Sequence, residues 1–425
     1  MELSNSPAHS KTSVSKKEFK NQRLNFELKS TPIDYFKLTK ELIDEGDGLF
    51  TVSVHDVEFG NDKYLDIDKH LDPFDYTGSD TTVFNFQTGK GKSTAFYNMI
   101  ELYVEGGYYV IVCSPFQKLV EKDCAALEKR VSEGNVFNYL KIKSDDELSN
   151  EAYRSIVSKP VHVMTINCLL QNPGENFQDQ SLVKRKYLTK LKQHIQDSGK
   201  KVVIFFDELH EAIRNFKSEF IRNLLTWKGI ANKCFISSAT FNFASIPVIR
   251  YISLLTETNI KIYEAKREKN NTLARLHLHL TSTSYHKAYL SPLSNLKILI
   301  NRYEKENRKI NILTGQKTLA KALMNAKSTD SLPEKVVKLS PVLLTRDTPQ
   351  NKFNPDGHNI GTTFKTGIDL EDENTVLIII LPAIEKDNET HYGIFSDGLP
   401  SLIQSVSRVR NGGDSFIYAG TSCYY

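Results

Sequence analysis

The chain has 425 residues, 40% of them hydrophobic and 25% charged, which is a composition typical of soluble globular proteins. Its longest aliphatic run, residues 376–381, is far shorter than the ~20 residues needed to cross a bilayer, so no membrane span is predicted and no membrane partner is expected. The net charge is only +4, from 55 basic and 51 acidic residues, so any nucleic-acid binding must come from a local basic surface.

The N-terminal part of the chain predicts a tail and an extension. Residues 1–30 hold too few apolar side chains to offset the entropy of ordering, so we expect a flexible tail. Residues 31–79 are acidic and rich in loop-forming residues, and we expect an N-terminal extension packed on the first domain. The first twenty residues lack the apolar core of a secretory signal, which favours a cytoplasmic location, or the host cytoplasm for a viral protein.

Residues 80–270 predict a first domain built on a parallel sheet. Short apolar runs at 81–86, 108–114, 161–167, 201–208 and 233–240 indicate strands buried on both faces. Amphipathic stretches at 93–105, 117–132 and 181–197 have the length of crossover helices, which parallel strands require.

Residues 271–425 predict a second domain of the same kind. Strands are expected at 275–281, 309–314, 336–340, 375–382 and 415–420, with helices between several of them. The charged run at 266–271 reads as the linker, which places the boundary near residue 270. The fold class is therefore α/β, with two mostly parallel sheets flanked by helices.

A phosphate-binding loop follows the first predicted strand. Such a loop directs backbone N–H groups and a helix N-terminus at phosphates, while its Lys reaches the outer phosphates and its Ser binds Mg²⁺. These features predict an ATP and Mg²⁺ site at Gln87, Thr88, Gly89, Lys90, Gly91, Lys92, Ser93 and Thr94. A turn without a ligand would not explain why a strand precedes this segment and a helix follows it.

Two carboxylates end the strand at 201–208. Asp207 is placed to hold Mg²⁺ together with Ser93, and Glu208 to orient and deprotonate the attacking water. Acidic residues at strand ends are common, so the interpretation depends on the phosphate loop in the same sheet.

Hydroxyl and cationic side chains follow later strands. Ser238 and Thr240 end the strand at 233–240, where hydroxyls can link the magnesium site to the second domain. Gln404, Arg408 and Arg410 lie near a predicted helix after Pro400, and Arg side chains there suit the charge on a transferring phosphoryl group. A Ser/Thr turn and a cationic helix end are the alternatives.

In order, the segments TGKGKS, DELH, SAT, TTFKTGIDL and QSVSRVR resemble motifs I, II, III, V and VI of superfamily 2 helicases. The resemblance covers roughly residues 80–420 and implies two tandem RecA-like domains with the ATP cleft between them. It assigns ATP hydrolysis to the loop, carboxylates and arginines above. It also assigns nucleotide contact to Gly367 and Asp369, coupling to His210, Ser238 and Thr240, and nucleic-acid contact to Thr165 and Thr363.

The last motif departs from the usual Q-x-x-G-R-x-x-R form. Ser407 stands in place of the Gly, and Arg410 comes two residues after Arg408, so which arginine acts as the finger stays open. The R-V-R form resembles viral replication helicases of the origin-binding type.

The function expected from these features is that of an ATP-dependent helicase or translocase, with DNA favoured over RNA, in phage or plasmid replication or in DNA processing. We expect a monomer that works with replication or defence partner proteins. Two alternatives remain: an ATP-controlled nucleic-acid clamp, and the motor subunit of a restriction or defence complex whose nuclease lies on another chain.

Overall fold

The structure, a computed structural model, describes residues 36–44, 46–142, 149–172, 179–266, 275–281, 294–325, 331–345, 347–348, 350–364, 368, 370–381, 399–409 and 413–420. Within these ranges, no helix combines the length and the apolar character that a bilayer span requires.

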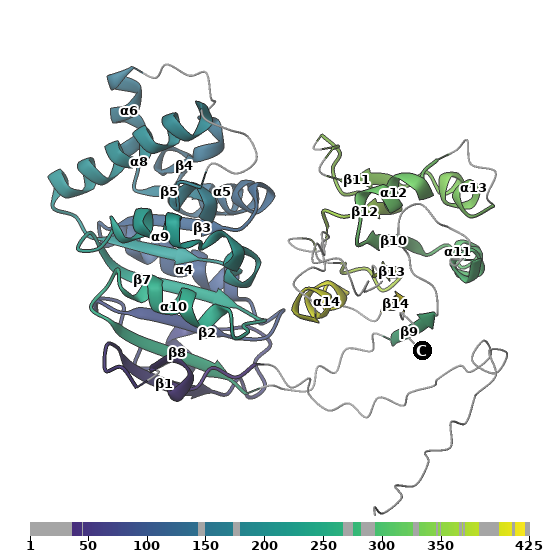
Figure 1. Ribbon diagram of the computed structural model, residues 1–425, viewed down its shortest axis with the longest axis horizontal. Coiled ribbons are helices and arrows are strands. Elements are labelled where there is room, and N and C mark those ends of the chain that lie inside the picture. Colours follow the sequence, from purple (N-terminus) through teal and green to yellow (C-terminus); the bar gives the residue numbers. More distant parts are fainter. Residues whose placement is uncertain are drawn as a thin grey trace, which may run out of the picture. The chain divides into compact units, whose positions relative to one another are not determined.

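The first sheet has eight parallel strands in the order β1-β8-β2-β7-β6-β3-β5-β4 (Figure 1). Its strands are β1 Thr51–Val57, β2 Thr81–Asn85, β3 Tyr109–Ser114, β4 Val136–Asn138, β5 Val161–Thr165, β6 Val202–Phe206, β7 Ala231–Ser238 and β8 Asn259–Ala265. Every residue of β2, β3, β5 and β6 is buried, as expected for central strands covered on both faces.

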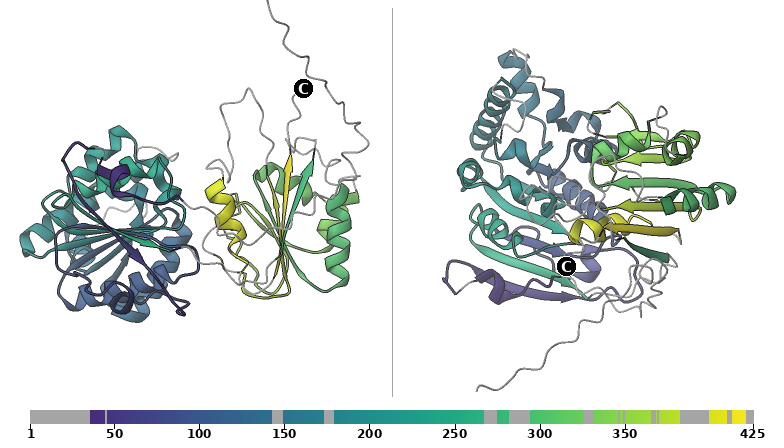
Figure 2. Two further views of the ribbon diagram at one scale, coloured as in Figure 1. Left: turned by 90° about the horizontal axis from the view of Figure 1, so that it is seen from below. Right: turned by 45° about the vertical axis from the view of Figure 1, so that its right-hand side comes forward.

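Helices cover both faces of this sheet, as Figure 2 shows in its left panel. The α-helices are α2 Lys40–Asp44, α3 Ile67–His70, α4 Lys92–Glu105, α5 Gln117–Val131, α6 Asn150–Val157, α7 Ile166–Leu169, α8 Asp179–Ser198, α9 Ser218–Leu225 and α10 Ser245–Ser253. Short 3₁₀ turns are η1 Glu133–Asn135, η2 Tyr139–Lys141 and η3 Leu209–Asn215. One continuous apolar core joins these helices to the sheet.

Over the residues that the structure describes, the second sheet has six parallel strands in the order β11-β12-β10-β13-β14-β9. Its strands are β9 Arg275–Thr281, β10 Lys309–Thr314, β11 Val342–Leu344, β12 Asn359–Gly361, β13 Thr375–Ile380 and β14 Asp414–Gly420. Its helices are α11 Ser294–Lys305, α12 Lys317–Leu323, α13 Ser331–Lys338 and α14 Leu399–Val406. Figure 2 shows α11 and α14 on opposite faces, and each face carries its own apolar cluster.

The predicted α/β architecture is confirmed, and one predicted strand is wrong. Residues 336–340 were expected to be a strand, but 336–338 end α13, while the nearby strand is β11. Leu332 and Val336 are buried four residues apart, the spacing of one helix face, so the two adjacent valines gave a misleading strand signal.

Three strands of the first sheet were not predicted: the short β4 and the paired strands β1 and β8. β1 lies in the segment described only as an extension, and β8 lies between α10 and the expected linker. The two strands pair with each other in register over seven residues, from Thr51 opposite Asn259 to Val57 opposite Ala265. The domain division near residue 270 stays a prediction.

A buried ion pair lies at the amino-terminal edge of the first sheet. Lys233 Nζ on β7 lies 2.6 Å from Asp80 Oδ1, and both side chains are almost fully buried. Lys261 Nζ lies 2.8 Å from the other oxygen of Asp80. Burial lowers the pKa of Lys233, and the carboxylate of Asp80 opposes that shift.

We expect Asp80→Ala to lower the free energy of unfolding by about 3–5 kcal/mol, because it leaves the ammonium of Lys233 buried without its carboxylate. Urea unfolding followed by circular dichroism would measure the change. The double variant Asp80→Ala/Lys233→Met removes both charges and should be more stable than the single variant. A single variant within about 1 kcal/mol of the unaltered protein would contradict this account.

Candidate active site

Strand order brings the predicted motifs together at one edge of the first sheet. β2, β7 and β6 are direct neighbours and run parallel, so the loops that follow them leave from the same edge. Ligands of open α/β sheets bind at the carboxyl ends of the strands. The phosphate loop, the Ser238 segment and the Asp207–Glu208 pair therefore share one site.

The phosphate loop turns sharply between β2 and α4. Gly89 and Gly91 have φ values of 82° and 77°, which side chains disfavour, and Gly91 directly precedes α4. A Cβ at Gly91 would lie 3.3 Å from Cβ of Tyr64, so space as well as backbone conformation favours glycine there. Gln87, Thr88 and Lys90 are buried in this loop, while Thr94 is exposed on the first turn of α4.

Lys92 lies under the loop and donates to its backbone. The ammonium lies 2.9 Å from the carbonyl oxygen of Phe86 and 3.1 Å from that of Gln87, and the side chain is buried. A cation held this way at the start of a helix adds positive charge to the N–H groups that face the loop.

Ser93 and Asp207 lie side by side, as their predicted joint role requires. Ser93 Oγ lies 3.5 Å from Asp207 Oδ2, and Ser237 Oγ donates to Asp207 Oδ1 at 2.6 Å. Burial, followed by the nearby carboxylates of Glu208 and Asp123, raises the pKa of Asp207 to about 6. A hydroxyl next to a buried carboxylate is an oxygen donor set of the kind Mg²⁺ takes, so the residues fit the metal.

Glu208 adopts the left-handed backbone conformation, with φ 47° and ψ 47°. Such a conformation is uncommon for a residue with a side chain, and it is found where surrounding structure holds it in place. Its Oε2 is buried without a hydrogen-bond partner among the described residues and lies 3.5 Å from His210 Nδ1.

His210 lies against three other predicted site residues, which are Glu208, Ser238 and Gln404. Its Nδ1 lies 2.8 Å from Ser238 Oγ, and its Nε2 lies 2.9 Å from Gln404 Oε1. Burial alone would lower the pKa of His210, but the hydrogen bond to Glu211 and the charge of Glu208 outweigh burial, so the pKa is raised.

Ser238 also accepts a hydrogen bond from the backbone N–H of Thr240 at 3.1 Å. The hydroxyl of Thr240 is buried and has no hydrogen-bond partner among the described residues. The two predicted coupling hydroxyls are thus adjacent.

Residues of the last motif adjoin α14 and the motif V segment. Gln404 is fully buried on α14, and Arg408, largely buried, follows the end of that helix. The carbonyl oxygen of Arg408 accepts from Leu370 N at 2.8 Å, which joins the last motif to the preceding one. Arg410, Gly367 and Asp369 lie outside the described residues.

The two threonines predicted to contact nucleic acid differ in their surroundings. Thr165 ends β5, where its hydroxyl oxygen accepts from Cys168 N at 3.2 Å and lies 3.0 Å from the hydroxyl of Tyr139. This hydroxyl therefore caps α7. Thr363 follows β12, and its hydroxyl oxygen has no hydrogen-bond partner among the described residues.

Sequence reasoning missed a buried carboxylate beside the site. Asp123 on α5 accepts from Ser114 Oγ at the end of β3 and from Tyr97 OH on α4 at 2.6 Å. Burial raises its pKa. The available signal was an acidic residue between Val120 and Leu127, within the buried stripe of the helix.

Comparisons with known proteins give one family match. Residues 53–248 match the family model for the type III restriction enzyme, res subunit. No significant match is found among curated protein sequences.

Among solved structures, the chain resembles the DEAD-box helicase Mss116 bound to ssRNA and UDP-BeF, with a TM-score of 0.54 and 15% identity over 81% of this chain and 67% of that chain. It also resembles the DUF1998 helicase MrfA bound to DNA and AMPPNP, with a TM-score of 0.51 and 12% identity over 81% of this chain and 46% of that chain. At such identities the likeness shows the fold, which is that of tandem RecA-like domains.

The family model covers residues 53–248, and the likeness to the two helicase structures shows that the chain has the fold of tandem RecA-like domains.

Proposed function

We propose that the chain is an ATP-dependent nucleic-acid translocase or helicase that hydrolyses MgATP and moves along DNA. The observation that carries this proposal is the contact of Ser93 with Asp207, directly before Glu208 and beside the phosphate loop. The MrfA structure contains DNA and AMPPNP, whereas the Mss116 structure contains single-stranded RNA, so the choice of DNA is part of the proposal.

The residues of the site divide the work of phosphoryl transfer between them. Lys92 reaches the outer phosphates, Glu208 orients and deprotonates the attacking water, and Arg408 or Arg410 stabilises charge on the transferring group. Ser93 and Asp207 would hold Mg²⁺, which would supply positive charge to neutralise phosphate oxygens. Thr165 and Thr363 are proposed to contact the nucleic-acid backbone, which would give little sequence preference.

The deciding experiment measures phosphate release by the purified chain with no polymer, with single-stranded DNA, with single-stranded RNA and with duplex DNA. We expect single-stranded DNA to stimulate turnover most. ATP binding with turnover indifferent to every polymer would contradict the motor and favour an ATP-controlled clamp.

The contact of His210 with Gln404 makes a second test available. We expect His210→Ala and Gln404→Ala each to lower the polymer-stimulated rate about 5–150-fold, the usual size of coupling between sites. Because the two side chains share one hydrogen bond, the polymer-stimulated rate of the double variant should be no lower than that of the less active single variant. If the fold-loss of the double variant equals the product of the two single losses, the two side chains act independently and not as a unit.

The family match favours one further candidate, a motor subunit of a restriction or defence complex, because the matched model is that of a type III restriction enzyme subunit. Strand displacement by the purified chain alone on a partial duplex would argue against a need for a partner.

A further inference from the structure

Helix α8 and the turn after it carry a concentrated positive charge. Residues 179–201 contain seven Lys or Arg and two Asp, a local excess of five, whereas the whole chain of 425 residues has a net charge of +4. The remainder of the chain is therefore close to neutral. This segment is the kind of local basic surface that nucleic-acid binding requires.

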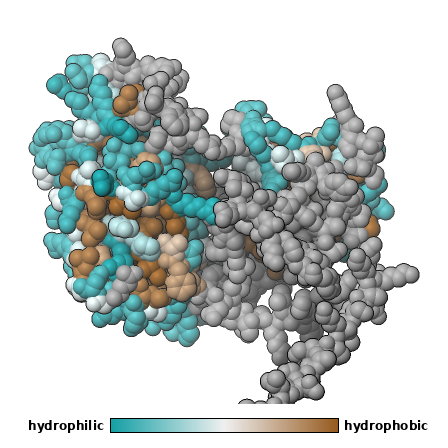
Figure 3. Space-filling view, in the orientation of Figure 1, coloured by the Kyte–Doolittle hydropathy of each residue, from teal (hydrophilic) through white to brown (hydrophobic). Residues whose placement is uncertain are grey.

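The charges lie on the outer side of the helix. Tyr187, Leu188 and Leu191 are buried and pack into the core of the first sheet, whereas Arg185, Lys186 and Lys190 are exposed. Figure 3 shows a mostly hydrophilic surface where Figure 1 places α6 and α8. The apolar stripe is used for folding, and the basic stripe faces solvent.

No carboxylate among the described residues pairs with this stripe. Among the residues that the structure describes, no carboxylate is within 4.0 Å of the charged nitrogens of Arg185, Lys186 or Lys190. The ammonium of Lys186 instead lies 5.1 Å from the ring centre of Tyr153. Lys186 and Lys190 stand four residues apart, a spacing at which like charges repel and weaken a helix.

The positive charge of α8 runs away from the edge of the first sheet that bears the motifs. It follows β5 and precedes β6, so its first half lies toward the carboxyl ends of the strands and its last turn toward their amino ends. A helix of 20 residues spans about 30 Å.

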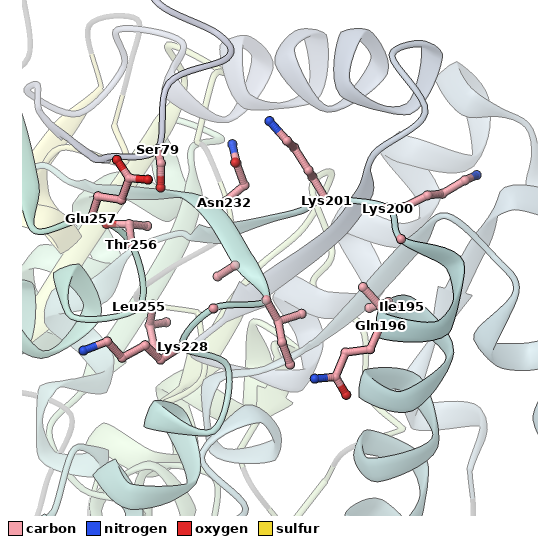
Figure 4. Close-up of a pocket in the computed structure, with 14 residues that line it drawn as sticks. Ser79, Ile195, Gln196, Lys200, Lys201, Lys228, Asn232, Leu255, Thr256 and Glu257 are labelled. Carbon is pink, nitrogen blue, oxygen red and sulfur yellow. The ribbon is translucent and has the colours of Figure 1, made fainter.

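A hollow of about 610 Å³ adjoins the last turn of α8, and Lys200, Lys201 and Lys228 help to line it. Figure 4 shows these three side chains extending in different directions instead of meeting at one point. They suit an extended polyanion better than a small anion.

We propose that Arg185, Lys186, Lys190, Lys200 and Lys201, here called the α8 ridge, bind the phosphate backbone of double-stranded nucleic acid. The inference rests on the proposed function, since it names the duplex as a second contact of the same motor. Duplex DNA carries one charge per ~1.7 Å of its axis, a density that a line of cations can match.

Two observations favour a duplex over other polyanions. Single-strand sites combine cations with exposed aromatic side chains, and no described residue of α8 is an exposed aromatic. A helix that binds anionic membranes needs a free apolar face, and the apolar face of α8 is buried in the core.

Fluorescence anisotropy tests the proposal with a single-stranded oligonucleotide, a blunt duplex and a duplex with a single-stranded tail. The variant Arg185→Gln/Lys190→Gln removes two exposed charges, and Lys129→Gln/Lys305→Gln removes two exposed charges on α5 and α11 as the matched control. Each protein is titrated from 0.05 M to 0.2 M salt.

We expect the ridge variant to bind both duplexes about tenfold or more weakly at 0.1 M salt, with the slope of log affinity against log salt reduced by about 1.8. The ridge variant's affinity for the single strand should stay within about twofold of that of the unaltered protein. The control's affinity for all three nucleic acids should stay within the same range. Unchanged duplex affinity and slope would overturn the inference, as would an equal loss in the control. Loss of binding to anionic vesicles or to a polyglutamate peptide, with duplex binding intact, would overturn it in favour of those partners. If the unaltered protein bound no nucleic acid at all, the proposed function itself would fail.

Discussion

Replacing Glu208 with Gln is expected to lower ATP hydrolysis by about 10²–10⁴-fold, the usual contribution of a general base. The amide keeps the size and most of the hydrogen-bonding capacity of the side chain but cannot accept the proton of the attacking water. Nucleotide affinity should change little, because Ser93, Lys92 and Asp207 are untouched. Phosphate release gives the rate, and titration with a fluorescent ATP analogue gives the affinity.

The control is Glu219→Gln, which makes the same change at an exposed position on α9, a helix that packs on the same sheet. It should hydrolyse ATP at the rate of the unaltered protein. A Glu208→Gln protein that retained more than a tenth of the original rate would remove Glu208 from its proposed role.

Replacing Lys92 with Met is expected to weaken ATP binding and to lower turnover by about 10²–10³-fold, the cost of losing one donor to developing charge. Met fills a similar volume, which limits the cavity left at this buried position. The two substitutions should therefore differ in kind: Lys92→Met raises the dissociation constant for ATP, whereas Glu208→Gln does not.

A melting curve would establish that the Lys92→Met protein is folded, and Lys129→Met on the surface of α5 serves as the control. Unchanged ATP affinity in a folded Lys92→Met protein would contradict the assignment of the phosphate loop.

The central strands could be predicted from sequence because burial on both faces leaves an uninterrupted apolar run. In β6, all five residues from Val202 to Phe206 are buried. β1 escaped prediction because it lies at the sheet edge, where only Val52 and Val57 are buried and three of the four residues between them are polar. β8 alternates apolar residues with charged ones such as Lys261 and Glu264, which resembles a surface segment.

Ser93 and Asp207 meet because of the order of the strands in the sheet. The sequence alone does not reveal this contact, because the two residues are more than a hundred positions apart. The motif pattern supplied the expectation, and the adjacency of β2, β7 and β6 accounts for it. The partners of His210 and the buried Asp123 could not be predicted, because side-chain contacts between distant segments leave no periodic signal in the chain.

The pairing of β1 with β8 also bears on aggregation. Without β1, the seven residues of β8 would present a row of unpaired backbone N–H and C=O groups along one side of the strand, which is a template for adding a strand from another molecule. β1 replaces that edge with one that carries Ser53, His55 and Asp56. A shortened chain starting at Asp80, just before β2, would lack β1 but keep every motif of the first sheet, and yet be prone to edge-to-edge association.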